Sequence, residues 1–211
     1  MTRGLFVVID GVDGAGKSTQ TTRLAAALVA KGRRVHVTAE PSALPIGATI
    51  REHLRGPRER APAWDTMALL FAADRLDHVA REIAPQLAAG VDVICDRYDA
   101  SSIAYQTATA PAELDRGAVA KWIARVNDRA MRPDLTLLFD LEPDLALARR
   151  ARRGAAEELY EARAIQLAVR AEYGRLRALR PDDRIVVIDA NADADAVHAR
   201  VLGAITPLLT Q

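Results

Sequence analysis

The chain has 211 residues, of which 50% are hydrophobic and 27% are charged, so it can bury a core and is not intrinsically disordered. Its 29 lysines and arginines nearly balance its 28 aspartates and glutamates. The net charge of +1 excludes bulk attraction to nucleic acid or to an anionic membrane as the main mode of binding. This length predicts one domain, with at most a small mobile insert.

The cysteine and histidine content argues against a disulfide or metal framework. The single cysteine, Cys95, cannot form an intramolecular disulfide, and the four histidines show no metal-ligand spacing. A lone thiol is typical of a reducing compartment, and we expect Cys95 to be inert core packing. The apolar run 5–9 is too short to cross a membrane and continues directly into Asp10, so it is not a signal peptide. The expected location is the cytoplasm.

Short apolar runs alternate with longer segments of helical period. The runs predict β-strands at 5–9, 35–38, 91–95, 135–139 and 185–188. The segments between and after them predict helices at 18–31, 46–55, 64–89, 113–129, 143–153, 157–179 and 193–209. Continuous β-branched runs indicate strands buried on both faces, so the predicted fold class is α/β, with a parallel sheet between layers of helices.

The longest predicted helix, 64–89, carries an apolar stripe that we expect to lie in the core. The stripe consists of Leu69, Ala72, Ala73, Leu76, Val79, Ala80 and Ile83. Pro85 lacks an amide hydrogen and is expected to bend or weaken the last turns, and Gly90 is a plausible stop. A basic cluster at 149–154 followed by acidic residues is the candidate for a mobile lid, at about 149–161.

The residues 11–18 match the whole G-x-x-x-x-G-K-[ST] pattern, between a predicted strand and a predicted helix. Glycines allow successive backbone N–H groups to point at phosphate oxygens, and the following helix adds its positive N-terminal end. We expect Lys17 to bridge the β- and γ-phosphates and the Ser18 hydroxyl to coordinate Mg²⁺. The alternative is a glycine-rich turn without a ligand. The predicted ATP contacts are Gly11, Val12, Asp13, Gly14, Ala15, Gly16, Lys17, Ser18 and Thr19.

Asp96 ends the third predicted strand, where a carboxylate can hold Mg²⁺ directly or through water. The alternative is a helix cap or a loop residue. The tripeptide 96–98, Asp-Arg-Tyr, is typical of small kinases. A GTPase would need a D-x-x-G switch after this strand and an N-K-x-D guanine reader, and the sequence contains neither.

These motifs, in their order along the chain, resemble those of thymidylate (dTMP) kinases. Further matching segments are Glu40-Pro41, Ile50-Arg51, 71–75 (FAADR), 101–106 (SSIAYQ) and 132–135 (RPDL). The resemblance implies a three-layer α/β/α fold with a five-stranded parallel sheet and a short lid. It also implies transfer of a phosphoryl group from ATP to dTMP with Mg²⁺, and a homodimer formed through the long helices.

The resemblance gives the matching positions roles that their chemistry can perform. Asp13 would contact the deoxyribose 3′-hydroxyl and the metal shell, and Arg51 and Arg97 would hold the monophosphate through bidentate hydrogen bonds. The predicted catalytic residues in this part of the site are Lys17, Asp13 and Arg97. The implied substrate contacts are Asp13, Glu40, Arg51, Phe71, Arg75, Arg97, Ser102, Tyr105 and Gln106.

Phe71 and Arg75 lie one turn apart on one helix face, and an aromatic platform beside a fixed donor fits a pyrimidine ring. Simple core packing is the alternative for Phe71, and a solvated helix charge is the alternative for Arg75. Tyr105 and Gln106 resemble contacts to the sugar and to the base edge, with Ser102 nearby.

Two departures from the family pattern affect the phosphate contacts. Many relatives carry arginine before the Glu-Pro pair, where this chain has Ala39, and the lid segment 158–161 has Leu159 where relatives often have arginine. Because position 14 is glycine, the resemblance implies that a lid arginine stabilises the transferring phosphoryl group. The candidates are Arg149, Arg150, Arg152 and Arg153, with Arg149 and Arg153 named as catalytic, and a solvated helix face is the alternative.

Two rival functions remain open from the sequence. One is a kinase for another pyrimidine nucleotide or for a nucleoside. The other is a P-loop regulatory or partition ATPase that binds a protein or DNA, against which the 71–75 segment and Asp96-Arg97 argue.

Overall fold

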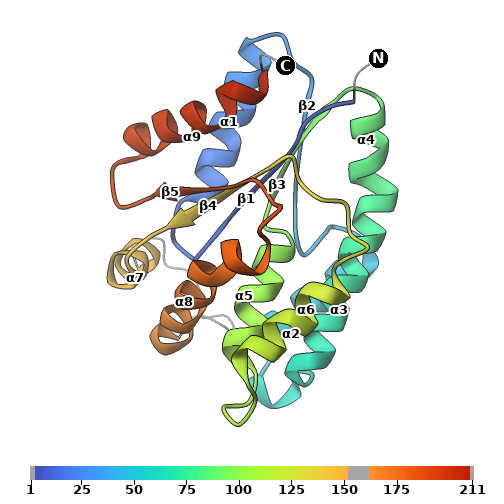
Figure 1. The fold of residues 1–211 in the computed structure, drawn as a ribbon, viewed down its shortest axis with the longest axis vertical. Helices are drawn as coiled ribbons and strands as arrows, with labels where there is room; N and C mark the ends of the chain where they lie inside the picture. Colours follow the sequence, from blue (N-terminus) through green and yellow to red (C-terminus); the bar gives the residue numbers. More distant parts are fainter. Residues whose placement is uncertain (1–2, 152–161, 210–211) are drawn as a thin grey trace.

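The computed structural model describes residues 3–151 and 162–209. A parallel five-stranded sheet forms its centre, in the order β2-β3-β1-β4-β5 (Figure 1). The strands are β1 (Phe6–Gly11), β2 (Val35–Ala39), β3 (Asp92–Asp96), β4 (Leu135–Asp140) and β5 (Ile185–Asp189). Each predicted strand is present within two residues of its expected bounds, so the α/β class and the parallel sheet are confirmed.

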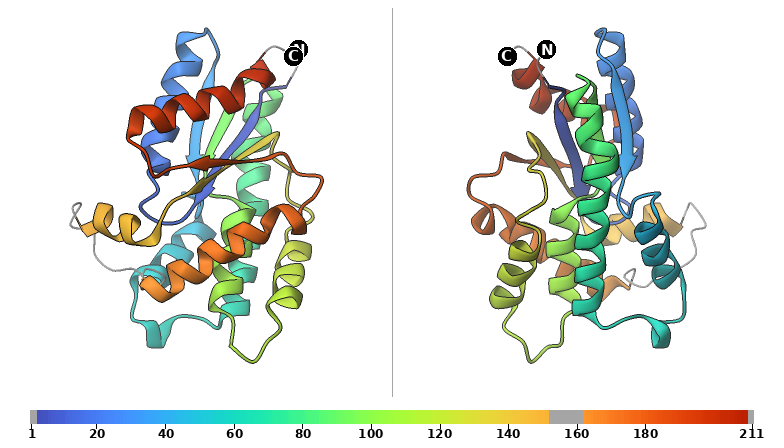
Figure 2. Two further views of the ribbon diagram at one scale, coloured as in Figure 1. Left: turned by 60° about the vertical axis from the view of Figure 1, so that its left-hand side comes forward. Right: turned by 90° about the vertical axis from the view of Figure 1, so that its right-hand side faces the viewer.

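Helices cover both faces of the sheet. On one face α1 and α9 pack together, and on the other α5 contacts α3, α6 and α8 (Figures 1 and 2). The helices are α1 (Lys17–Ala30), α2 (Pro45–Arg55), η1 (Arg58–Arg60), α3 (Trp64–His78), η2 (Val79–Ile83), α4 (Ala84–Ala88), α5 (Asp99–Thr109), α6 (Arg116–Val126), α7 (Pro143–Ala151), α8 (Arg163–Leu179) and α9 (Ala194–Leu209).

The central strand β1 shows why its sequence is a continuous apolar run. Its successive side chains point to opposite faces of the sheet. Val7 and Ile9 belong to one hydrophobic cluster, whereas Phe6 and Val8 belong to a second cluster on the other face. All four are fully buried, and each burial contributes roughly 1.5–3 kcal/mol to the stability of the fold.

The predicted helix 64–89 is continuous in space but changes its hydrogen-bond pattern (Figure 1). It passes from α3 through the π-helical turn η2 into the short helix α4, which contains Pro85. Proline has no N–H to donate to the carbonyl four residues earlier, so a regular ladder cannot run through this point. The predicted disturbance near Pro85 is confirmed.

The prediction that the whole stripe on α3 lies in the core is wrong. Leu69 is 51% exposed and Leu76 is 40% exposed. The buried residues of α3 are the apolar Met67, Ala68 and Ala72 together with the polar Asp74, Arg75 and His78. Apolar periodicity finds a hydrophobic face, but it does not say whether the same chain covers that face.

The helix α5 is not among the elements predicted from the sequence, because its first turn is rich in the serine and aspartate typical of loops. The predicted helix 113–129 is shorter in the structure, starting after Asp115, whose side chain accepts a hydrogen bond from the Ala118 N–H at 2.6 Å. The ends predicted at 153 and 157 lie outside the described residues.

Candidate active site

The register of the sheet brings the sequence motifs together. Ile9 of β1 and Ala39 of β2 both pair with Asp96 of β3. The phosphate loop after β1, Glu40 after β2 and Arg97 after β3 therefore emerge side by side at the carboxyl edge. Ligands of open parallel sheets bind at this edge.

The phosphate loop requires glycine at position 14. The backbone of Gly14 has φ of +82°, and a Cβ atom there would lie 2.7 Å from the carbonyl oxygen of Ala146 in α7. A side chain at this position would need α7 to move. Glycine at position 14 therefore lets α7 pack directly against the phosphate loop.

Lys17, at the start of α1, is buried beside the loop. Its ammonium donates hydrogen bonds to the carbonyl oxygens of Gly11, at 3.1 Å, and Val12, at 2.9 Å. Burial, together with the nearby positive charge of Arg97, lowers the pKa of Lys17 to about 8. The positive charge of the buried ammonium is balanced only by two carbonyl oxygens and by Asp13 Oδ1 at 4.0 Å. A bound phosphate group would supply a closer anionic partner.

Ser18 and Asp96 form a pair that fits a divalent cation. The Ser18 hydroxyl donates to Asp96 Oδ2 at 2.7 Å, while Asp96 Oδ1 is buried without a hydrogen-bond partner among the described residues. No cluster of three or more His, Cys, Asp or Glu side chains within 3–151 and 162–209 could hold a metal ion. A cation here would therefore bind these two residues, water and the phosphates of the nucleotide, as Mg²⁺ prefers.

Arg97 adopts a backbone conformation that is rare for a residue with a side chain, with φ of +73°. Asp10 stabilises this turn, because its Oδ2 accepts hydrogen bonds from the N–H groups of Tyr98, at 3.1 Å, and Ser101, at 3.0 Å. The turn directs the Arg97 guanidinium to Asp13, with which it forms an ion pair, and to Ser101 Oγ at 2.9 Å. Asp10 is a site residue that the sequence analysis missed.

Asp13 is the point where the loop, α5 and α8 meet. Its carboxylate accepts hydrogen bonds from the Tyr105 hydroxyl, at 2.8 Å, and the Gln166 amide, at 3.1 Å. Burial alone would raise the pKa of Asp13, but the charges of Arg97 and Lys17 hold it well below the ordinary range. Asp13 is therefore ionised at neutral pH. Gln166, which the sequence analysis also missed, fixes it from α8.

Two hollows adjoin at this edge and share Asp13, Glu40 and Arg97. The first lies over the phosphate loop, and its other lining residues are Gly14, Gly16, Lys17, Ser18, Ala39 and Asp96. The second is lined in addition by Pro41, Leu54, Phe71, Ser101, Ser102, Tyr105 and Gln106. The structure thus brings most of the predicted substrate contacts into one continuous site.

Arg75 lines neither hollow and is only 1% exposed, so the alternative of a solvated helix charge is wrong. Its guanidinium pairs with Glu40 at 2.7 Å and donates to Ser102 Oγ at 3.1 Å and to the Asn127 side chain. The Tyr98 ring centroid lies 5.0 Å from its central carbon. Arg75 therefore acts on the hollow through Glu40 and Ser102.

Ser102 and Gln106 stand one turn apart on α5 and present complementary groups to the hollow. Because Ser102 Oγ accepts the hydrogen bond of Arg75, its own O–H can donate to a ligand. Gln106 Oε1 is buried without a hydrogen-bond partner in the described part of the chain. The wall therefore offers a donor next to an acceptor.

Two other predicted residues, Arg51 and Arg149, line neither of these hollows. Arg51 donates to the carbonyl oxygens of Pro41, at 2.8 Å, and Ser42. Arg149 donates to the carbonyl oxygens of Ala190, at 3.0 Å, and Ala192, at 3.1 Å. It lines a third hollow, on the outer side of the phosphate loop, together with Ala15, Gly16, Thr19, Gln20, Ala192, Ala194 and Val197. The side chains of Arg150, Arg152, Arg153 and Leu159 lie outside the described part.

Comparison with known proteins gives a consistent picture. A model of the thymidylate kinase family matches residues 9–201. A thymidylate kinase of Cereibacter sphaeroides is 41% identical over 99% of this chain and 97% of its own length. One of Solidesulfovibrio magneticus is 40% identical over 97% of this chain and 100% of its own. The solved structure of thymidylate kinase from Candida albicans superimposes with a TM-score of 0.80 at 26% identity, covering 98% of this chain and 93% of that one.

Proposed function

The chain belongs to the thymidylate kinase family, and we propose that it transfers the γ-phosphoryl group of ATP to dTMP, forming ADP and dTDP. The observation that carries the proposal is the junction of the two hollows. A phosphate loop and a base-sized pocket share Asp13, Glu40 and Arg97, so a donor and an acceptor phosphate would meet there.

The reaction requires alignment and charge neutralisation rather than a strong base. The attacking atom is a phosphate oxygen that is largely ionised at neutral pH, so no proton has to be removed by a histidine or carboxylate. Lys17 and Arg97 neutralise the charge that develops on the transferred group. Asp13, held ionised beside Arg97, orients that guanidinium and can accept a hydrogen bond from the sugar 3′-hydroxyl.

We place Mg²⁺ at Ser18 and Asp96. Asp96 Oδ1, which has no hydrogen-bond partner within residues 3–151 and 162–209, and the neighbouring Ser18 hydroxyl are oxygen donors of the kind that this cation prefers. When bound, the ion would neutralise charge on the β- and γ-phosphates. Within residues 3–151 and 162–209, no helix is both long and apolar enough to span a membrane. The single, buried Cys95 supports a reducing location, the cytoplasm.

A coupled ADP-release assay across dTMP, dUMP, dCMP, UMP and thymidine tests the proposal. We expect dTMP to be the best substrate, and turnover to require Mg²⁺. Preference for another nucleotide or for thymidine would support the rival kinase. ATP hydrolysis without an acceptor, stimulated by DNA, would support the partition ATPase.

The position of Arg149 leads to a test of its role. Because Arg149 faces the hollow on the outer side of the phosphate loop, Arg149→Ala is expected to raise the KM for ATP about tenfold, the effect of one lost charged hydrogen bond. The KM for dTMP should stay unchanged. The control is Arg175→Ala, on the exposed surface of α8, for which both KM values should stay unchanged. A fall in kcat with both KM values unchanged would instead support the transition-state role predicted for Arg149.

We also propose a homodimer through α3. Leu69 and Leu76 are a heptad apart and exposed on the same face, a pattern typical of helix–helix contacts between copies. Leu69→Glu together with Leu76→Glu should convert a dimer into monomers in sedimentation velocity, because the charges would be buried without partners. The control Leu114→Glu, exposed elsewhere, should leave the sedimentation coefficient unchanged. A monomeric wild type would overturn this assembly.

A further inference from the structure

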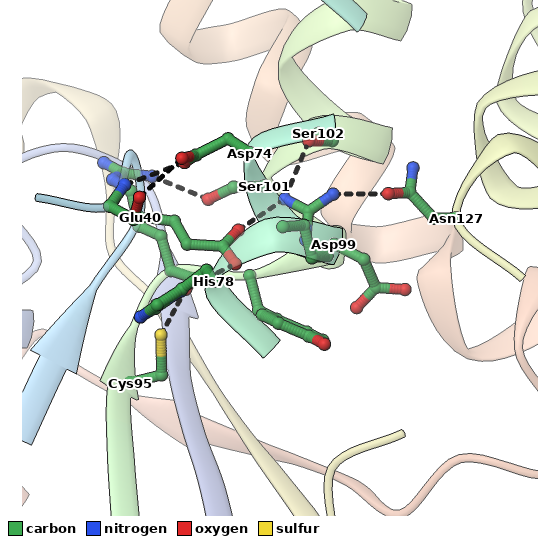
Figure 3. A network of polar contacts seen from close by, with 12 residues as sticks. Glu40, Asp74, His78, Cys95, Asp99, Ser101, Ser102 and Asn127 are labelled. Atoms are coloured by element: carbon green, nitrogen blue, oxygen red, sulfur yellow. Dashed lines mark hydrogen bonds and ion pairs between the residues drawn. The ribbon is translucent and has the colours of Figure 1, made fainter. Parts of the chain in front are cut away.

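His78 is a fully buried histidine that the reaction described above does not use. It lies on α3 one turn after Asp74 and three residues after Arg75, and it is not among the residues that line either hollow. Its Nδ1 atom is 3.3 Å from Glu40 Oε1 (Figure 3). Its Nε2 atom is 2.8 Å from Thr38 Oγ1 on β2. Both ring nitrogens are therefore engaged by the segment that carries Glu40.

Glu40 divides its two carboxylate oxygens between two cations. Oε2 pairs with the Arg75 guanidinium at 2.7 Å, and Oε1 faces His78. Glu40 also lines both hollows. A rotation of this carboxylate would break the Arg75 pair and reshape the wall that receives the base, so the partner on Oε1 helps to fix both.

The histidine is connected to the surface on its other side. Its Nε2 atom is 3.5 Å from Glu82 Oε2 on η2, and Glu82 Oε1 lies 2.8 Å from His36 Nε2. The side chains of Glu82 and His36 are 26% and 31% exposed, whereas that of His78 is 0% exposed. A line of titratable groups thus runs from solvent to the wall of the nucleotide site.

We propose that His78 is a positioning residue for the acceptor nucleotide: as the imidazolium it fixes Glu40, and through Glu40 the Arg75 guanidinium, so that affinity for dTMP falls when His78 loses its proton. The proposal rests on the proposed function. It gives a role in binding to a group that touches neither substrate.

The groups around His78 favour its charged form. Facing it are Glu40 from the loop after β2, Glu82 from η2, and Asp74 on its own helix. Arg75, Cys95 and Tyr98 also interact with the charge of Glu40. Burial alone would lower the pKa of His78, but Glu40, through its hydrogen bond and its charge, and then Glu82 and Asp74 raise it above the ordinary value.

The sign of the pH effect follows from this raised pKa. If dTMP binds more tightly to the protein with a charged His78, its affinity is full while His78 is protonated and falls as the pH rises through the raised pKa of His78 in the ligand-free protein. Affinity for dTMP should therefore fall toward alkaline pH. The dTMP phosphate has its second pKa near 6, so measurements above about pH 7 keep its charge constant.

The test compares the wild type with His78→Asn and His78→Leu. The Asn side chain can place an N–H near the position of Nδ1 and does not titrate, whereas Leu removes the donor. His36→Asn is the matched control at the outer end of the line. The readouts are the dissociation constant of dTMP by calorimetry and the KM values for dTMP and ATP, each from about pH 7 to 9.

For the wild type and His36→Asn we expect dTMP to bind about tenfold more weakly at the alkaline end, the effect of one lost hydrogen bond to a charged group. His78→Asn should show a profile that differs by less than about twofold across the range, and affinity near that of the wild type at neutral pH. His78→Leu should bind dTMP about tenfold more weakly throughout, with the KM for ATP unchanged.

Two results would overturn the inference. One is the same pH dependence in His78→Asn as in the wild type. The other is an equal loss of dTMP and ATP affinity in His78→Leu, which a purely structural role would produce. A wild type that phosphorylates no dTMP at any pH would overturn the proposed function itself, and that result differs from both.

Discussion

Lys17→Ala should lower kcat at least 10²- to 10³-fold, because the loss of a charge facing the transferred phosphoryl group costs roughly 3 kcal/mol or more. Thermal unfolding of the ligand-free protein should stay unchanged or shift upward. The Lys17 ammonium is buried against two carbonyl oxygens, 4.0 Å from Asp13 Oδ1, and burial depresses its pKa. Replacing Lys17 therefore removes a charge whose burial costs free energy of folding, so the fold should not lose stability. Single-turnover phosphoryl transfer and differential scanning calorimetry measure the two effects.

The matched control is Lys121→Ala, an exposed lysine on α6, for which kcat should be that of the wild type. Near-normal turnover of Lys17→Ala would contradict the assignment of the phosphate loop. A large fall in the unfolding temperature would show that Lys17 acts in folding as well as in chemistry.

The elements that the sequence predicted best are those whose signal is local. The phosphate loop at 11–18 is a fixed pattern with its context of strand and helix, and the apolar runs of the strands are buried on both faces. Asp96 and Arg97 follow directly from the end of β3. In each case residues that are adjacent in the sequence are sufficient to predict the local structure.

The residues that the sequence analysis missed act across long separations. Gln166 reaches Asp13 from 153 positions away, and Asn127 reaches Arg75 from 52 positions away. No sequence pattern identifies a buried glutamine or asparagine of this kind, because its hydrogen-bond partners are brought to it by the tertiary fold. For Leu69 and Leu76 the heptad spacing is real, but the described residues leave these two side chains 51% and 40% exposed.

The site should discriminate strongly between thymine and cytosine. Wild-type kcat/KM for dTMP is expected to exceed that for dCMP by at least about 10²-fold. Thymine offers an acceptor at O4 beside a donor at N3, which matches the Ser102 O–H and Gln106 Oε1. Cytosine reverses both groups, and each buried mismatch costs about 1–3 kcal/mol. UMP should also fail, because Tyr105, which lines the hollow and is held by Asp13, is predicted to close against the sugar C2′.

We expect this discrimination to depend on Arg75, which holds Ser102 and Glu40 in place. Arg75→Ala should abolish most of the preference, but it also breaks the buried ion pair with Glu40 and leaves Glu40 Oε2 without its cation, which costs about 3–5 kcal/mol of folding free energy in such pairs. Urea unfolding should show this loss directly. A milder variant, Ser102→Ala, removes only the donor in the wall and should reduce the dTMP-to-dCMP ratio about tenfold with little change in stability.

The control for Ser102→Ala lies on the same helix. Thr107→Val removes a buried hydroxyl that has no partner within the described residues and does not line the hollow, so the ratio should not change. The measurement is kcat/KM for dTMP, dUMP, dCMP and UMP on each variant. Equal use of dCMP and dTMP by the wild type, or undiminished discrimination in both Arg75→Ala and Ser102→Ala, would show that this wall does not read the base.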